Sequence, residues 1–477
     1  MVQSVASIRP RRFEPLRDLS HRPGVLRAPL VAGTLVASAA LARSPSPVVL
    51  GGLAGLIGLL VCWRWPGVAL ASLVLGALII PFQIATGTQT SINAAVIMTA
   101  LFAGLWLFEM LIRRDVRLLP SRAVAPTLVF GLVCVVAFVA GLQVWQPFAT
   151  TAPLPTQLGG LAAYLLSLAA FLLTAHRIRE LGWLQALTWL YLAWAAVYMV
   201  RRTGLVSDLP ISVPVGADYS VFWTWVAALS FSQAAFNTRL ARGWRAALFL
   251  LTAATVFAGL RLVTWNSGWV PPLVALSVIL WLGAPRLALV FTIVGLLGVL
   301  LKIDALSGIL FGAKNQYDLL TRTAAWSILF DIIRLDPILG IGFGNYYWYM
   351  PLYFILGFPV SFNSHNNYID LLAQTGLLGL ASFGWLMWAI TRIGWRLRRR
   401  APVGFARAYV YGALGGLAGM LVSGLLGDWV LPFVYNIGLV GFRSSVHGWL
   451  FLGGLIAIEQ IVLRDSVGLE LAHPDAK

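Results

Sequence analysis

Long apolar runs recur along almost the whole chain, and they constrain its fold more than any other feature. Most approach the roughly 20 residues that a straight helix needs to cross a bilayer. The runs at 269–284 and 286–301 flank Pro285 and can also form one re-entrant pair, so the number of spans is known to within about two. The fourteen runs lie at about 29–43, 47–62, 66–83, 91–112, 123–146, 157–175, 183–200, 219–236, 246–264, 269–284, 286–301, 366–391, 407–427 and 445–463.

The composition agrees with this pattern. Only 11% of the 477 residues are charged, whereas soluble domains carry about 25%, so a soluble globular enzyme is excluded. A transmembrane barrel would instead show alternating segments of about 10 residues. We therefore predict an all-α, polytopic membrane protein of about 12–14 transmembrane helices.

The distribution of positive charge predicts the orientation of these helices. With the N-terminus in the cytoplasm and the sides alternating, 25 of the 34 Lys and Arg residues face the cytoplasm. The positive-inside rule then favours two cytoplasmic termini. The net charge of +17 therefore reflects cytoplasmic loops that set the topology and contact anionic lipid. Nucleic-acid binding is not expected. The nine outer cations are Arg43, Arg201, Arg202, Arg261, Lys302, Lys314, Arg322, Arg334 and Arg443.

The chain divides into segments by polarity. We expect a basic cytoplasmic tail at 1–28, a helix array at 29–301, an extracytoplasmic loop at 302–365, C-terminal helices at 366–463 and a cytoplasmic tail at 464–477. A loop this long in a compact protein is usually functional or disordered. An alternative for the N-terminus is a signal peptide ending near Ala42, which would leave the outer face unchanged.

The outer loop contains one amphipathic pattern. Trp326, Leu329, Phe330 and Ile333 recur at helical spacing, and Pro337 ends the pattern. We expect Arg322 in the first turn, where its guanidinium and the free N–H groups would converge on a bound anion. An ion pair with Asp318, four residues earlier, is the equally weighted alternative.

Glycines and aromatic residues follow this helix. The run Gly340-Ile341-Gly342-Phe343-Gly344 follows no strand, so we attribute it to tight backbone packing or close approach of a ligand, not to nucleotide binding. Next come Tyr346, Tyr347, Trp348, Tyr349, Tyr353 and Phe354. Such residues form belts at lipid headgroups, and stacking on a sugar is the functional alternative.

His365 lies where the chain re-enters the membrane, and it is the only histidine predicted on the outer loop. A neutral imidazole with a pKa near 6.5 can accept a proton at neutral pH. A histidine that only satisfies local polar groups is the simpler alternative. The neighbouring amides of Asn366 and Asn367 are expected to fix its tautomer.

Two further cations, Arg261 and Arg443, are predicted at outer ends of spans and therefore need partners. Candidate carboxylates are Asp208, Asp218, Asp304, Asp318, Asp331, Asp336 and Asp428. Cys62 and Cys134 lie in apolar runs and suggest neither a disulfide nor a metal site. No Asp-x-Asp motif or His cluster is present, so we expect no metal and no cofactor.

Residues about 322–380 resemble the C-terminal module shared by bacterial O-antigen ligases and O-antigen polymerases. The matching positions are Arg322, Trp326, Pro337, Gly340, Gly342, Phe343, Gly344, His365, Asn366, Tyr368, Leu371, Gly376 and Gly379. The resemblance implies a GT-C-like, metal-independent glycosyltransferase that uses an undecaprenyl-diphosphate-linked glycan on the outer face of the inner membrane. It also implies diphosphate binding by Arg322 and activation of the acceptor hydroxyl by His365.

The chain departs from that family at one motif. Family members often carry Ser-Arg-Gly near the start of an earlier span, and the corresponding stretch here contains Asn266-Ser267-Gly268. Arg261 is the nearest arginine that could take the missing role.

The residue types alone, apart from the family resemblance, also fit this chemistry. A lipid diphosphate leaves readily, so the reaction needs cations for the diphosphate and a base for the incoming hydroxyl. We assign catalysis to His365 and Arg322. Substrate binding is assigned to Arg261, Arg443, Asn366, Tyr368, Tyr346 and Trp348.

The expected partners are a lipid-linked oligosaccharide donor, a sugar acceptor, the bilayer and a chain-length regulator. Polymerisation of O-antigen or exopolysaccharide repeats is favoured, with ligation to a lipid A core as the alternative. A lipid-linked sugar transporter is the rival class, although we see neither inverted repeats nor interrupted helices. A peptidoglycan polymerase would depend instead on a loop carboxylate such as Asp318 or Asp331.

Overall fold

A computed structural model describes residues 47–87, 90–116, 118–204, 213–262, 266–301, 313–355 and 357–472. The chain forms two compact units, Met1–Trp65 and Pro66–Lys477. In the first unit the described helix is α2, Pro47–Arg64. The predicted span at 29–43, the basic tail and the signal-peptide alternative lie outside the described residues.

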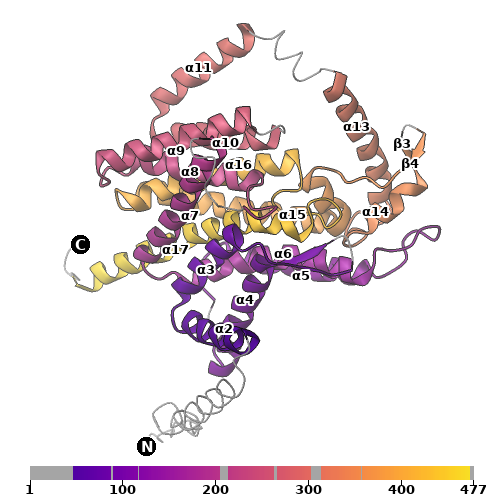
Figure 1. Ribbon diagram of the computed structural model, residues 1–477, viewed down its shortest axis with the longest axis horizontal. Helices are drawn as coiled ribbons and strands as arrows, with labels where there is room; N and C mark the ends of the chain where they lie inside the picture. The colour runs from indigo at the N-terminus through magenta and orange to yellow at the C-terminus, as the bar shows by residue number, and fades with distance from the viewer. Residues whose placement is uncertain are drawn as a thin grey trace, which may run out of the picture. The chain divides into compact units, whose positions relative to one another are not determined.

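Helices dominate the second unit, which Figure 1 shows with its labels. A helix is present at every predicted apolar run in the described part of this unit. Its helices are α3 Pro66–Ile79, α4 Ala94–Arg113, α5 Val124–Ala140, α6 Leu154–Arg177, α7 Leu181–Arg202, α8 Ser220–Phe236, α9 Arg242–Arg261, η1 Asn266–Gly268, α10 Val270–Gly283, α11 Pro285–Leu301, α13 Ala313–Ile333, α14 Asn345–Tyr349, η2 Met350–Leu352, α15 Asn367–Arg400, α16 Phe405–Leu426, η3 Gly438–Gly441 and α17 Phe442–Ala472.

Within the described residues, eight helices are long and apolar enough to cross a membrane. Several shorter apolar helices accompany them, among them α3, α5 and much of α11. The β structure described is confined to two short antiparallel pairs, β1 (Gln83–Ala85) with β2 (Ser91–Asn93) and β3 (Phe354–Ile355) with β4 (Phe358–Pro359). The predicted all-α polytopic fold is confirmed.

Helix α16 packs closely against α8 and α10 through glycines spaced three or four residues apart. A Cβ on Gly412 would lie 2.4 Å from Ser232 Oγ of α8, and one on Gly416 would lie 2.8 Å from Trp225 of the same helix. A Cβ on Gly419 would lie 2.6 Å from Pro271 O of α10. In lipid the hydrophobic effect does not drive helices together, so their association depends on close packing. Small residues at this spacing let the two backbones approach closely.

Helix α15 is interrupted near its start, at Gly376, whose φ of 63° and ψ of −167° are not helical. The backbone of 337–342 enters this break: Ile341 N donates to Ala373 O (2.9 Å), and Leu377 N donates to Pro337 O (2.8 Å). A Cβ on Gly340 would lie 2.6 Å from the backbone of 374–376. The prediction of uninterrupted helices is therefore wrong for α15. Tight backbone packing explains the glycine run, because those glycines admit the second chain segment.

Helix α13 begins at Ala313, thirteen residues before Trp326, the first residue of the predicted pattern. Arg322 is consequently the tenth residue of the helix and not part of its first turn. The predicted convergence of Arg322 with the free N–H groups of the helix start is wrong. Residues 314–318 are mostly polar, so the amphipathic pattern gave no sign of this extension.

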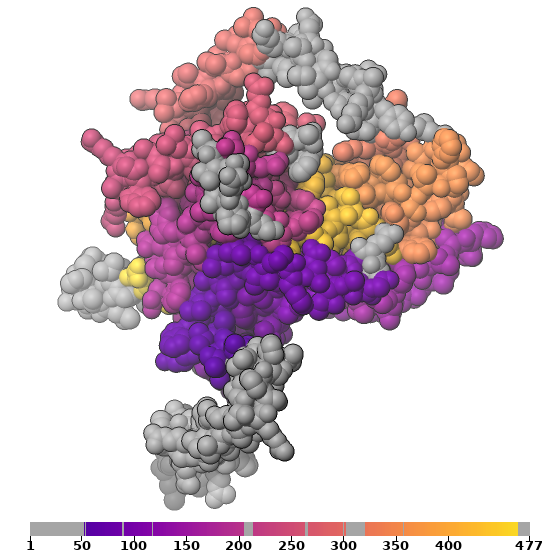
Figure 2. All heavy atoms as spheres, viewed as in Figure 1, coloured from indigo at the N-terminus to yellow at the C-terminus, as the bar shows by residue number. Residues whose placement is uncertain are grey.

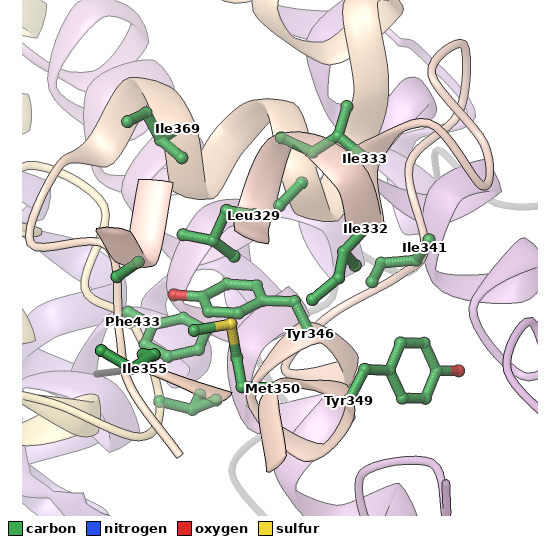
Figure 3. Close-up of a cluster of buried hydrophobic side chains, with 13 residues drawn as sticks. Leu329, Ile332, Ile333, Ile341, Tyr346, Tyr349, Met350, Ile355, Ile369 and Phe433 are labelled. Carbon is green, nitrogen blue, oxygen red and sulfur yellow. The ribbon is translucent and has the colours of Figure 1, made fainter. Parts of the chain in front are cut away.

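A buried apolar cluster joins α13 to α14 and to the segment before α17. Leu329, Ile332 and Ile333 of α13 contact Tyr346, Met350 and Phe433. Figure 3 shows the Tyr346 ring beside Phe433, and Figure 2 shows this orange part of the chain against the yellow C-terminal part. This cluster supports the start of α15, where the predicted site residues lie.

Candidate active site

The start of α15 is fastened by two asparagines. Asn366 is the N-cap, and its side-chain oxygen accepts from the backbone N–H groups of Tyr368 (2.9 Å) and Ile369 (3.4 Å). The amide of Asn367 donates to Leu431 O (2.7 Å), and its oxygen accepts from Val430 N (2.8 Å). Both amides therefore bind backbone groups around the start of α15.

His365 precedes this cap in a left-handed backbone conformation, with φ of 46°. Such a conformation is uncommon for residues other than glycine and is found at functional sites. The backbone N–H of His365 donates to Asn363 Oδ1 (3.1 Å), and its half-buried ring lies edge-on to Phe362 with centroids 5.6 Å apart.

The amide of Asn436, a residue that follows α16, approaches the imidazole. Its Nδ2 lies 3.5 Å from His365 Nδ1 and donates to Asp428 Oδ1 at 2.5 Å. The structure thus aligns a carboxylate, an amide and an imidazole. Sequence reasoning missed Asn436, because the residues lie 71 positions apart and only the fold brings them together.

Asp428 is 1% exposed and lies between the spans α16 and α17. Its second oxygen accepts from Phe433 N at 3.0 Å. Burial raises the pKa of Asp428 to about 6, although hydrogen bonds from Asn436 and the backbone act in the opposite direction. The sequence proposed Asp428 only as a partner for arginine, and no such pair is present among the described residues.

A second buried carboxylate, Asp370, lies in the first turn of α15. Its Oδ1 accepts from Ser364 Oγ (2.7 Å) and Tyr346 Oη (2.5 Å), while Oδ2 has no hydrogen-bond partner among the described atoms. Burial and the nearby Asp370 raise the pKa of Tyr346, so its hydroxyl keeps its proton and donates. A carboxylate inside an apolar span is itself a functional signal, and this signal could have drawn attention to Asp370.

Arg322 is linked to His365 through Trp326. Trp326 lies one turn after Arg322 on α13, a rise of about 6 Å along the axis. Its Nε1 donates to Ser364 O at 2.8 Å, and Ser364 directly precedes His365. Arg322 is half-buried, and no hydrogen bond or ion pair to it is present among the described side chains. The Asp318 side chain is outside that part, so the ion-pair alternative is untested.

Arg443 has a different environment from the one predicted. It is 0% exposed, and its guanidinium donates to Ile80 O (2.6 Å) and Phe82 O (2.8 Å), just beyond the end of α3. Its Nε has no hydrogen-bond partner in the described residues. These contacts fasten α17 to α3, and none of them joins Arg443 to His365 or Arg322.

Arg261 is the last residue of α9 and is exposed. The stretch after it returns through η1, where Gly268 O lies 3.1 Å from the Cβ position of Gly259. The described contacts do not connect Arg261 with His365. Its assignment to the substrate stays a prediction.

The aromatic residues of α14 divide into core and surface. Tyr346 is 0% exposed and stacks on Phe433 with centroids 4.7 Å apart, so its ring face is covered. Tyr349 is also buried. Trp348 is 38% exposed, and its Nε1 donates to Tyr435 Oη at 2.5 Å. Of these three side chains, Trp348 is the one open to a sugar or to lipid.

Tyr368 faces α16, where its hydroxyl donates to Leu421 O at 2.7 Å. Among the outer aspartates, Asp331 pairs with Arg334 at 2.7 Å, and Asp336 caps the backbone of 338–339. Among the described residues, no group of three or more His, Cys, Asp or Glu side chains could hold a metal ion.

Comparison with known proteins agrees with the predicted resemblance. Residues 240–384 match the family model described as O-antigen ligase, a range that includes Arg261, Arg322 and His365 but neither Asp428 nor Arg443. No curated protein matches the chain. A chain from the structural study of polymerization and crosslinking by a peptidoglycan synthase complex is 17% identical, with a TM-score of 0.41, over 72% of this chain and 97% of that chain.

Proposed function

We propose, from the match to the O-antigen ligase family and from the surroundings of His365, that this membrane protein is a glycosyltransferase. It transfers an undecaprenyl-diphosphate-linked glycan to a sugar hydroxyl on the outer face of the inner membrane. The preferred reaction is polymerisation of O-antigen or exopolysaccharide repeats. Ligation of the finished chain to a lipid A core is the alternative within the same chemistry.

One observation carries the proposal. The imidazole of His365 lies in a strained turn at the end of a span, and a hydrogen bond ties that turn to the helix that carries Arg322. A base and a cation are the two groups that transfer from a lipid diphosphate requires. Both lie in the segment that matches the family.

In the proposed step, the oxygen of the acceptor hydroxyl forms a bond to the anomeric carbon of the donor. The bond from that carbon to the diphosphate oxygen breaks, and its electron pair leaves with undecaprenyl diphosphate. His365 takes the hydroxyl proton, and Arg322 balances the charge that develops on the diphosphate. A single displacement inverts the anomeric centre, and no metal ion takes part.

The position of Asn436 supports the role of His365. Since Asn436 Nδ2 donates one hydrogen to Asp428, its second hydrogen faces His365 Nδ1. This contact favours the tautomer whose Nδ1 lone pair is free of a proton. We infer that Nδ1 accepts the proton when the acceptor hydroxyl displaces the amide.

The interrupted helix of α15 does not favour a transporter. Transporters use such breaks to line a substrate cavity. Here Ala373 O and Gln374 O accept from Ile341 N and Gly342 N, and the amides of 377–378 donate to the same loop. Protein backbone therefore fills the break.

The decisive experiment gives the purified protein a defined lipid-linked repeat. A ladder of products supports polymerase, whereas product only after addition of a lipid A core supports ligase. Lipid that crosses the bilayer without covalent change would refute both. His365→Ala should lower turnover by about 10²–10⁴-fold, and Arg322→Ala should be similarly impaired.

Arg334→Ala is the matched control, because Arg334 is exposed, lies just after α13 and pairs only with Asp331 among the described residues. It should retain near-normal turnover. If Asp331→Asn abolishes turnover while His365→Ala does not, the chemistry depends on a loop carboxylate as in the peptidoglycan-polymerase alternative.

A further inference from the structure

A cavity of about 430 Å³ lies between α7 and α9, in a part of the chain that the proposed reaction does not use. Its walls are apolar and include Trp189, Leu192, Trp244, Leu248 and Leu251. Its volume falls within the range of about 300–1,000 Å³ that is common for small-molecule sites. An apolar chain is the kind of group that such walls accept.

A second, more polar hollow of about 240 Å³ adjoins this cavity, since Trp189 and Leu240 line both. Its other walls include Gln185, Asn237 and Arg239, together with the turn after α15 at 402–403 and the start of α16 at 405–406. The two hollows therefore provide an apolar compartment followed by a polar one.

Asn237 lines the polar hollow and carries a buried acceptor that is unsatisfied. The residue is 4% exposed, and its Nδ2 donates to Gln233 Oε1 at 2.8 Å. The orientation of both amides is set, because Gln233 Nε2 donates to Phe405 O (3.2 Å). Asn237 Oδ1 is left without a hydrogen-bond partner in the described chain. A buried acceptor of this kind favours a ligand that carries a donor.

Arg239 presents a cation at the same hollow. Its side chain is exposed, and its Cδ lies 2.9 Å from the Cβ position of Gly404. The neighbouring Arg245 donates to Ala234 O (2.7 Å), and Arg407 donates to Ala401 O (3.0 Å). No ion pair or hydrogen bond to the Arg239 guanidinium occurs among the described residues, so its charge is open to an anion.

The surroundings fit an interface with anionic lipid. Arg242 begins α9, and Arg398, Arg399 and Arg400 end α15. Glu180 is the N-cap residue of α7 and precedes Leu181, which lines the polar hollow. The positive-inside rule places such an arginine-rich end at the cytoplasmic leaflet, where the lipids carry negative charge.

We propose that these two hollows bind one molecule of phosphatidylglycerol from the cytoplasmic leaflet. An acyl chain occupies the apolar cavity between α7 and α9, the phosphate contacts Arg239, and a glycerol hydroxyl donates to Asn237 Oδ1. Phosphatidylethanolamine offers donors but carries no net charge, so it matches the unpaired cation less well. The bound lipid would join α7 and α9 to the turn between α15 and α16.

The test is native mass spectrometry of the full-length protein in detergent, with phosphatidylglycerol and phosphatidylethanolamine added in competition. Wild type should retain one phosphatidylglycerol in preference to phosphatidylethanolamine. Arg239→Gln should lower that preference at least tenfold. Ala196→Phe, which places a ring in the apolar cavity, should weaken retention of both lipids.

Arg392→Gln is the matched control, because it removes an equal charge from α15 outside both hollows. Equal loss of preference in Arg392→Gln and Arg239→Gln would show a diffuse charge effect and overturn the site. Equal retention of the two lipids by wild type would overturn the head-group assignment. If a polypeptide copurifies with wild type and is released by Ala196→Phe, then a polypeptide and not a lipid occupies the apolar cavity, and the proposal is overturned.

Discussion

Replacement of Gly376 by alanine tests whether the break in α15 holds the candidate site together. Gly376 has φ of 63° and ψ of −167°, a region that is essentially accessible only to glycine. A Cβ at this position would lie 2.1 Å from Ile338 O. Alanine cannot be accommodated unless the 337–342 segment moves out of the helix break.

The expected cost follows from these contacts. Backbone strain of this kind costs about 1–3 kcal/mol. Displacement of the loop would also break hydrogen bonds between the loop and α15. Ile341 N and Gly342 N donate to α15, and Leu377 N and Leu378 N donate to the loop. Each such bond contributes about 0.5–1.5 kcal/mol net to stability. We expect a loss of stability of about 3 kcal/mol or more, together with a misplaced start of α15.

The control is Gly384→Ala on the same helix, where no atom lies within 4 Å of the Cβ position. Alanine in a regular helix is favoured over glycine by about 0.5–1 kcal/mol. The apparent thermal midpoint in detergent and the turnover of lipid-linked substrate should both fall for Gly376→Ala and stay near wild type for Gly384→Ala. Equal midpoints and turnover for the two variants would refute the proposed role of the break.

Three further predictions concern single contacts in the candidate site and in the helices around it. Trp326→Phe removes the hydrogen bond to Ser364 O, worth about 0.5–1.5 kcal/mol, and should lower turnover more than Trp348→Phe does; equal effects would argue against coupling of Arg322 to His365 through Trp326. Because burial raises the pKa of Asp428 to about 6, its protonated form stabilises the fold below about pH 4, and this contribution is lost as the pH rises through about 6. Thermal midpoints measured across that window should decline in wild type and be flatter in Asp428→Asn. Arg443→Met leaves Ile80 O and Phe82 O without their donor, so it should lower the thermal midpoint and leave KM for the donor unchanged; a raised KM with an unchanged midpoint would instead support substrate binding by Arg443.

The sequence alone could predict the two catalytic residues, but it could not predict the residues that contact them. Arg322, Trp326 and His365 were recognisable because their spacing resembles a known module. Asp428 and Asn436 were not, since their approach to His365 depends on how the segment after α16 folds back over α15. The opposite error occurred at Tyr346, whose position in an aromatic run suggested an exposed ring, whereas Phe433 covers it.

The apolar runs determined the fold class and the places of the described spans, because hydrocarbon admits only segments that satisfy their own backbone hydrogen bonds. Local pattern likewise marked the amphipathic helix at Trp326 and the glycine run beyond it. Tertiary structure alone decided that α15 breaks at Gly376, that Arg443 fastens α17 to the end of α3, and that Asn436, bound by the buried Asp428, approaches His365. Each of these depends on contacts between residues distant in the chain, and such contacts leave no periodic signal in a single sequence.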